Sequence, residues 1–230
     1  IIMGKMALGY GSEFHLLRWL GRHRNEFDKR VKNVIEVNNV TWLDFNFGET
    51  KNTLDNELIG IEFLKNEPGF NKILDCWKNE WPQSGSSMNW DLVGYTTHNS
   101  IKTWILIEAK ADFAEMKQKC QATSPRSIEK IETALANTAK NNGIRIKDDS
   151  PWTRKFYQIA NRLFVLDFLK RNRINAKLIN IYFVGDEIPN NQKLPKNKEE
   201  WKPKIVEMKN YLAIENSDLA MYELFLDVRK

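Results

Sequence analysis

Three charged side chains lie at the ends of two neighbouring strand-like segments of the sequence. Asp91 belongs to the first segment, residues 89–95, and Glu108 and Lys110 lie near the end of the second, residues 104–111. Successive side chains of a strand point to opposite faces, so Glu108 and Lys110 share one face. A carboxylate and an ammonium group therefore lie side by side at the end of a mostly apolar strand, where charge is uncommon.

The short polar turn between the two segments predicts how they pair. If residues 99–100, Asn-Ser, form a two-residue hairpin loop, His98 lies opposite Ile101. Counting back from that pair places Asp91 opposite Glu108, on the same face, with Cβ atoms about 5 Å apart. Asparagine tolerates the positive φ that such a loop requires, although Asn-Gly is the stronger signal. A one-residue slip of the strands would turn Asp91 to the other face.

Two carboxylates at that separation repel each other by about 3 kcal/mol at an effective dielectric constant of about 20. A proton, a neighbouring lysine or a divalent cation would offset this repulsion. Carboxylate oxygens that leave room for water and for phosphate oxygens suit Mg²⁺. Lys110 would then hold the attacking water or a phosphate oxygen. The three side chains together indicate metal-assisted hydrolysis of a phosphodiester.

Asp91, a spacer and the run Glu108-Ala109-Lys110 at a strand end resemble the PD-(D/E)XK nucleases, which have the restriction-endonuclease-like fold. The resemblance implies that Asp91 and Glu108 bind Mg²⁺, with Mn²⁺ as a substitute, and that Lys110 supports the attacking water. It covers the order of elements from the first helix to about residue 186, but only a few side chains. One departure is Trp90, which precedes Asp91 where the family pattern has proline.

The resemblance points to two further residues on helices. Gln158, one helical turn before Arg162, is similar to a glutamine that supports the metal site or DNA in exonuclease-like members. Glu13, with Glu26 behind it, is similar to an acidic residue on the first helix that completes the metal sphere in several branches. The alternatives are a helix-surface amide for Gln158 and, for Glu13, a carboxylate favoured by the helix dipole in the first turn.

Hydrophobic periodicity and turn residues predict the elements that must position these side chains. Helices are expected over residues 13–31, 71–81, 112–121, 124–141, 152–172 and 201–212. Strands are expected over residues 34–37, 40–43, 59–63, 89–95, 104–111, 176–185 and 224–228. This order predicts one α/β domain, residues 1–230, with a mixed central sheet flanked by helices. By the resemblance, a restriction-endonuclease-like core carries a helical insertion at about 112–150, and a helix and a strand follow at about 197–230.

Composition narrows the class of protein. The chain has 230 residues, a formal net charge of +5 and a pI of about 9.0, which is compatible with a polyanionic partner. The two cysteines form neither a disulfide framework nor a metal-ligand pattern and fit a reducing cytoplasm. The absence of an apolar run near 18 residues argues against a membrane span, so we expect no membrane partner.

The sequence favours a Mg²⁺-dependent nuclease that acts on DNA. One alternative is a non-catalytic domain that keeps the fold and binds nucleic acid or a protein partner. Another is an α/β protein in which Glu108 and Lys110 form a structural ion pair. Catalysis is favoured because all three chemical residues are present, and a degenerate domain would be expected to have lost at least one. RNA as a substrate, a homodimer, and internal or terminal cleavage all stay open.

Overall fold

The computed structural model describes residues 9–43, 58–83, 88–187, 194–215 and 217–229. A five-stranded sheet has the order β1-β4-β5-β6-β7, and a separate two-stranded sheet joins β2 and β3. The strands are β1 (Thr41–Trp42), β2 (Leu58–Ile59), β3 (Asn89–Trp90), β4 (Leu92–His98), β5 (Ile101–Lys110), β6 (Asn175–Val184) and β7 (Met221–Asp227). The helices are α1 (Ser12–Arg22), α2 (Arg24–Ile35), α3 (Phe70–Glu80), α4 (Pro125–Asn141), α5 (Tyr157–Arg171) and α6 (Lys198–Leu212), with short 3-10 turns η1 (Glu62–Leu64) and η2 (Glu115–Lys117).

The central sheet is mixed, as the sequence predicts. β1 pairs antiparallel with β4, and β4 pairs antiparallel with β5. β6 pairs parallel with β5, and β7 pairs parallel with β6 at the edge of the sheet. The chain reaches β6 from β5 through α4 and α5, because parallel neighbours require a long crossover connection.

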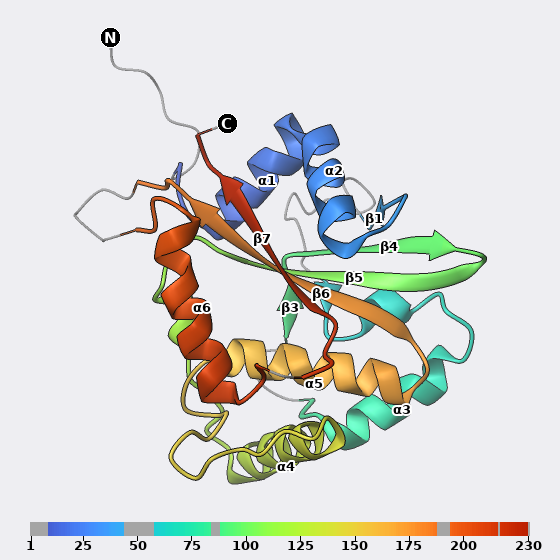
Figure 1. Ribbon diagram of the computed structural model, residues 1–230. Helices are drawn as coiled ribbons and strands as arrows, with labels where there is room; N and C mark the ends of the chain where they lie inside the picture. The colour runs from blue at the N-terminus through green and yellow to red at the C-terminus, as the bar shows by residue number, and fades with distance from the viewer. Residues whose placement is uncertain (1–8, 44–57, 84–87, 188–193, 216, 230) are drawn as a thin grey trace, which may run out of the picture.

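Helices cover both faces of the sheet (Figure 1). On one face, here called the α1 face, Ile105, Ile107 and Ile179 belong to a core with buried residues of α1 and α2. On the other, here called the α5 face, Trp104 and Leu106 belong to a core with buried residues of α3, α4, α5 and α6. Odd and even positions of β5 therefore face different cores, which follows from the alternation of side chains along a strand.

The β4–β5 hairpin has the register that the sequence predicts. His98 pairs with Ile101, and Leu92 pairs with Ile107. Both loop residues adopt the left-handed backbone conformation that this tight turn requires, Asn99 with φ 48° and Ser100 with φ 63°. Asp91 precedes the first paired residue of β4, so it lies beside Glu108 at the next position of the hairpin.

Helix α5 lies under the sheet and is buried on all sides. Every residue from Ile159 to Leu169 is buried, although the sequence indicates only a broad apolar stripe. The reason is that α5 has a second layer beneath it. Trp81 stacks on Phe164 with ring centroids 4.6 Å apart, and α4 packs along the same helix. Polar residues within this span are therefore buried as well.

Four predicted elements differ from the structure. The helix expected over residues 13–31 is two helices that break at His23. The strand expected over residues 34–37 is wrong, because Ile35 continues the buried face of α2 one turn after Val31 and the helix ends at Glu36 with φ 55°. The strand expected over residues 59–63 ends at residue 59 and gives way to η1.

The fourth is the helix expected over residues 112–121, of which only the turn η2 forms. Asp112 Oδ1 accepts hydrogen bonds from the backbone N–H groups of Ala114 and Glu115, at 2.5 and 3.0 Å. A side chain that bonds to the following backbone in this way favours a local turn over a continued helix.

Candidate active site

The end of β5 brings two opposite charges into the interior of the protein. Glu108 and Lys110 lie on the α5 face, with only 1% and 5% of their surfaces exposed. The Lys110 ammonium group donates a hydrogen bond to Glu108 Oε1 and another to the backbone oxygen of Ala109, at 3.1 Å. The pair that the sequence predicts at this strand end is therefore a buried ion pair.

Asp91 joins the pair from the neighbouring strand. Its Oδ2 accepts a hydrogen bond from the backbone N–H of Ala109, at 2.6 Å. Ala109 separates Glu108 from Lys110 in the sequence, so the Asp91 carboxyl group lies beside both charged residues. The adjacent, antiparallel arrangement expected for Asp91 and Glu108 is present.

A second cation reaches Glu108 from α5. Arg162, with 2% of its surface exposed, approaches Glu108 Oε2 with its Nε at 2.8 Å and its Nη2 at 2.7 Å. Its guanidinium group also donates to the backbone oxygen of Asn89, and it lies 4.5 Å from the centre of the Trp90 ring. Arg162 thus links α5, β3 and β5 at one point.

The sequence does not predict that Arg162 and Glu115 belong to the site. Arg162 was recognisable as a charged residue one turn after Gln158 on an apolar helix, but its contact with Glu108 depends on how α5 crosses the sheet. Glu115 is half-buried in η2, where its Oε2 accepts from the N–H of Ala111 at 3.4 Å and its charge interacts with Lys110. The sequence predicts a regular helix at these residues, and such a helix does not indicate the contact that Glu115 makes in the turn η2.

Burial and charge set the protonation of the carboxyl groups in different directions. Burial and the nearby Glu108 raise the pKa of Asp91 from its ordinary 3.8 to about 7, although Lys110 and Arg162 oppose the rise. Burial alone would also raise the pKa of Glu108, but Arg162 and Lys110 outweigh it, so this pKa is lowered. Near neutral pH, Glu108 is therefore ionised while Asp91 is partly protonated.

Burial and neighbouring charges also shift the pKa values of Lys110 and Glu115. Burial would lower the pKa of Lys110, but Glu108 and Asp91 raise it above its ordinary value, so the ammonium form persists. Burial raises the pKa of Glu115 despite the opposing charge of Lys110. The site therefore contains one fully compensated carboxylate and two carboxyl groups whose ionised forms are disfavoured.

Glu13 does not lie where the sequence-based hypothesis places it. The side chain is exposed in the first turn of α1, which packs on the opposite face of the sheet from Glu108. His15 and Leu16 occupy the buried side of this helix and thereby turn Glu13 outward. The expectation that Glu13 points into the site rather than to solvent is wrong. Glu26, its substitute on α2, accepts from Arg30 at 2.9 Å in the next turn of the same helix.

Gln158 is not fully exposed, and its role in the site stays a prediction. It is half-buried in the first turn of α5 and lines the same cavity as Asp91. Its Oε1 is buried, and no described residue donates a hydrogen bond to it.

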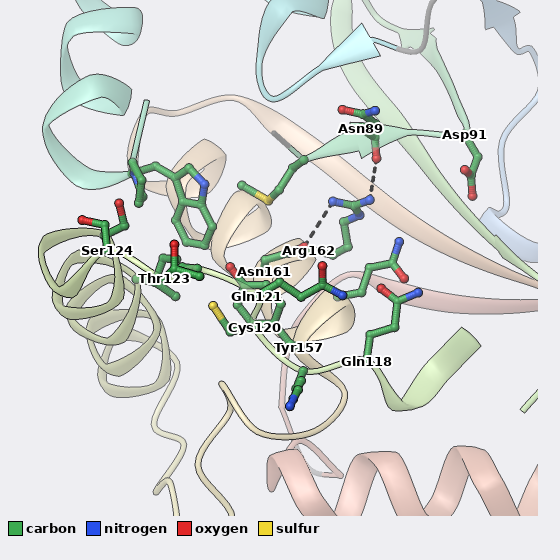
Figure 2. A pocket seen from close by; sticks show the side chains of 18 residues that line it. Asn89, Asp91, Gln118, Cys120, Gln121, Thr123, Ser124, Tyr157, Asn161 and Arg162 are labelled. Carbon is green, nitrogen blue, oxygen red and sulfur yellow. Dashed lines mark hydrogen bonds between the residues drawn. The ribbon is translucent and has the colours of Figure 1, made fainter. Parts of the chain in front are cut away.

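A cavity of about 530 Å³ opens beside Asp91. Figure 2 shows Asp91 and Asn89 at one side of this cavity and Thr123 and Ser124 at the other, with Asn161 and Gln121 between them. Its walls come from residues around β3, from the segment 118–124 and from the first turns of α4 and α5. Of the three predicted catalytic residues, Asp91 lines this cavity, whereas Glu108 and Lys110 do not belong to its lining.

Proteins commonly hold Mg²⁺ through one or two carboxylates, with water and phosphate oxygens as the remaining ligands. Asp91 and Glu108 supply two such groups, and the charge of Glu108 is, after burial, the second cause of the raised pKa of Asp91, which a cation would offset. A site built wholly from side chains is not indicated, because the described residues contain no cluster of three or more His, Cys, Asp or Glu suited to a metal. His15 is instead paired with Asp186, with Nε2 and Oδ1 2.8 Å apart.

Comparisons of the chain with protein-family models, curated proteins and solved structures find no match. Within the described part of the chain, no helix has both the length and the apolar character that crossing a membrane requires.

Proposed function

We propose that this chain is a Mg²⁺-dependent nuclease that hydrolyses phosphodiester bonds of DNA. The observation that carries the proposal is the meeting of Asp91, Glu108 and Lys110 at one end of the central sheet, with Asp91 lining an open cavity. Two carboxylates and a lysine beside a hollow that admits a ligand are the groups that metal-assisted hydrolysis needs. A purely structural ion pair needs neither the second carboxyl group nor the cavity.

The order of elements supports a restriction-endonuclease-like core. An antiparallel run, β1-β4-β5, is followed by α5 and the parallel strand β6, with α1 preceding the sheet. This is the order that the sequence resemblance to PD-(D/E)XK nucleases implies. Strand β7 would extend that core by one parallel strand.

Each residue has a definite task in this proposal. Asp91 and Glu108 would hold Mg²⁺, which when bound polarises the phosphate and lowers the pKa of bound water. Lys110 would orient the attacking water and stabilise negative charge as it develops on the phosphate. Arg162 keeps Glu108 ionised and fixes its orientation. A cation that binds to Glu108 would displace at least one of its contacts with Lys110 and Arg162.

The test is a cleavage assay on purified protein with Mg²⁺ or Mn²⁺, with and without EDTA. Asp91→Asn, Glu108→Gln and Lys110→Met should each abolish cleavage, because residues that act as one unit show similar single losses. Lys102→Met is the matched control. Lys102 lies on the same strand, at its other end, and pairs with Glu67. Cleavage that survives unchanged in Lys110→Met, or is lost equally in Lys102→Met, would contradict the assigned role.

One observation favours a second candidate, a non-catalytic domain that binds nucleic acid or a protein partner. Both oxygens of Glu108 are already occupied, by Lys110 and by Arg162, and the carboxylate is almost wholly buried. Such a group also fits a structural centre. In that case metal would neither bind at Asp91 nor stabilise the protein, and the cleavage assay would stay negative with every divalent cation.

A further inference from the structure

The cavity beside Asp91 extends well beyond what a metal ion and a water molecule occupy. Its volume of about 530 Å³ falls in the range of pockets that hold small organic ligands. It runs from Asp91 to Ser124, the residue before α4 (Figure 2). A ligand bound at Asp91 through a phosphate would therefore have space to place a further group inside the protein.

The lining of the cavity combines apolar side chains with amides. Trp81, Met88 and Ile131 contribute buried apolar surface. Five amide side chains contribute hydrogen-bond donors and acceptors: Asn89, Gln118, Gln121, Gln158 and Asn161. Asp91 is the only acidic residue among the described residues of the lining. A flat group with apolar faces and polar edges fits such a lining, and nucleobases have this character.

Two of these amides differ in whether the side-chain oxygen accepts a hydrogen bond. Asn161 Oδ1 accepts from Arg162 Nη1 at 3.1 Å, so Asn161 is fixed by the cluster around Glu108. Gln158 Oε1 is buried without a partner among the described residues. A buried acceptor without a donor is costly, and an N–H group of a ligand would remove that cost.

We propose that this cavity binds one unpaired nucleobase of a DNA strand whose backbone passes Asp91. The inference rests on the proposed nuclease function and deepens it, because it makes single-stranded DNA, or a frayed DNA end, the substrate class. A base in a duplex reaches such a pocket only after it leaves the stack, which costs free energy that an unpaired base does not need. Bases held in this way bind through apolar contact with their faces and hydrogen bonds to their edges.

The experiment measures binding without metal, in EDTA, by fluorescence anisotropy of a short labelled DNA strand. Its comparisons are a strand of the same length in which every nucleotide is abasic, and a blunt duplex. The intact strand should bind about tenfold more tightly than either, since base contacts of this kind carry that much discrimination. Equal affinity for the intact and the abasic strand would overturn the proposal. Tighter binding of an RNA strand of the same sequence would overturn DNA as the occupant.

Variants on α4 and in the segment before it test whether the preference for the intact strand arises in the cavity. Ser127→Trp should fill the hollow and abolish the preference for the intact strand, because Ser127 lines the cavity. Thr133→Trp adds the same indole at an exposed position of the same helix and should keep the preference. Gln121→Ala replaces an exposed lining residue and should weaken binding of the intact strand alone, by about threefold to tenfold. A preference that persists in both Ser127→Trp and Gln121→Ala would place the base elsewhere.

The outcome separates this inference from the proposed function. If the base preference is present and no cation supports cleavage, the cavity is a base site and the nuclease assignment falls. If DNA is cleaved but intact and abasic strands bind equally, the nuclease assignment holds and the base site falls.

Discussion

At the scale of single residues, the site is a group of charges that balance one another incompletely. Glu108 has Lys110 and Arg162 as partners, whereas Asp91 accepts its described hydrogen bond from a backbone N–H and has no ion pair among the described residues. Asp91 is therefore the residue whose ionisation the protein disfavours and whose charge a cation would restore. The protonation state of Asp91 should therefore depend both on pH and on whether a metal ion is bound.

Asp91→Asn should stabilise the metal-free protein above neutral pH. The folded protein retains the Asp91 proton up to a pH of about 7, whereas the unfolded chain releases it above 3.8. The free energy of unfolding of the wild type therefore falls as pH rises through this window, by at most about 1.4 kcal/mol per pH unit. The free energy of unfolding of Asp91→Asn does not fall in this way, because asparagine has no proton to release in this pH range. Urea unfolding at pH 4 and pH 8 should show an advantage for the variant at pH 8 that vanishes at pH 4.

Added Mg²⁺ should reduce the advantage of Asp91→Asn at pH 8. A ligand that binds only the folded protein raises the free energy of unfolding by about 2.7 kcal/mol at a hundredfold excess over Kd. Wild type should gain this stability, and Asp91→Asn should not. The apparent Kd for Mg²⁺ should also decrease as pH rises toward 7, because protons compete with the cation for Asp91. A thermal shift with Mg²⁺ that is equal in both proteins would contradict a metal site at Asp91.

Arg162→Met should destabilise the protein by about 3–5 kcal/mol, because it leaves the Glu108 carboxylate buried with only Lys110 as a partner. Arg162→Lys should recover little of the loss, since a lysine does not reproduce the contacts that Nε and Nη2 make with Glu108 and Asn89. Lys170→Met is a suitable control on the same helix, where the lysine is exposed. Equal losses for the Arg162 and Lys170 variants, measured by urea unfolding, would contradict a special role for Arg162.

At the scale of elements, the β4–β5 hairpin sets the alignment of the two carboxyl groups. Ser100→Gly should raise the free energy of unfolding by about 1 kcal/mol, because glycine adopts the left-handed conformation at φ 63° without a steric penalty. Ser100→Ala, which keeps a Cβ atom, should give no such gain. Cleavage should be unchanged in both, since the register and the loop length are preserved. Thermal unfolding and the nuclease assay together check this expectation.

Elements that local patterns define were predictable from the sequence. The hairpin follows from a two-residue polar loop between apolar runs, and α4 follows from Ser124-Pro125 at its start and Gly143 after its end. The β-branched Val34 and Ile35 favour a strand, but they lie in α2, because tertiary packing against the sheet outweighs that preference.

The candidate site was predictable only in part. Asp91, Glu108 and Lys110 follow from strand alternation and hairpin register, which are local rules. The contact of Arg162 with Glu108 depends on the path of α5 beneath the sheet, and the placement of Glu115 depends on an irregular turn. Neither has a periodic signature. The exposed position of Glu13 depends on which side of α1 meets the sheet, which Leu16 and its buried neighbours decide.

At the scale of the whole molecule, the sheet divides the interior into two apolar cores. Tryptophans report on both: Trp19 belongs to the core on the α1 face, and Trp90 and Trp104 belong to the core on the α5 face. The prediction that residues 1–230 form one domain therefore has a direct test. Tryptophan fluorescence and far-ultraviolet circular dichroism should give coincident urea transitions. Two separated transitions would indicate that the two sides of the sheet unfold independently.

The hairpin also bears on the order in which the protein folds. The strands of Asp91 and Glu108 are joined by a two-residue loop, and hairpins form in about 1–10 μs, whereas Arg162 belongs to α5, within the long crossover from β5 to β6. We therefore expect the two acidic groups to meet before Arg162 reaches Glu108. Arg162→Met should therefore speed unfolding while leaving the refolding rate nearly unchanged, the behaviour of a contact formed after the transition state. Arg162 would therefore slow unfolding by stabilising an arrangement of the two carboxyl groups that the hairpin has already formed.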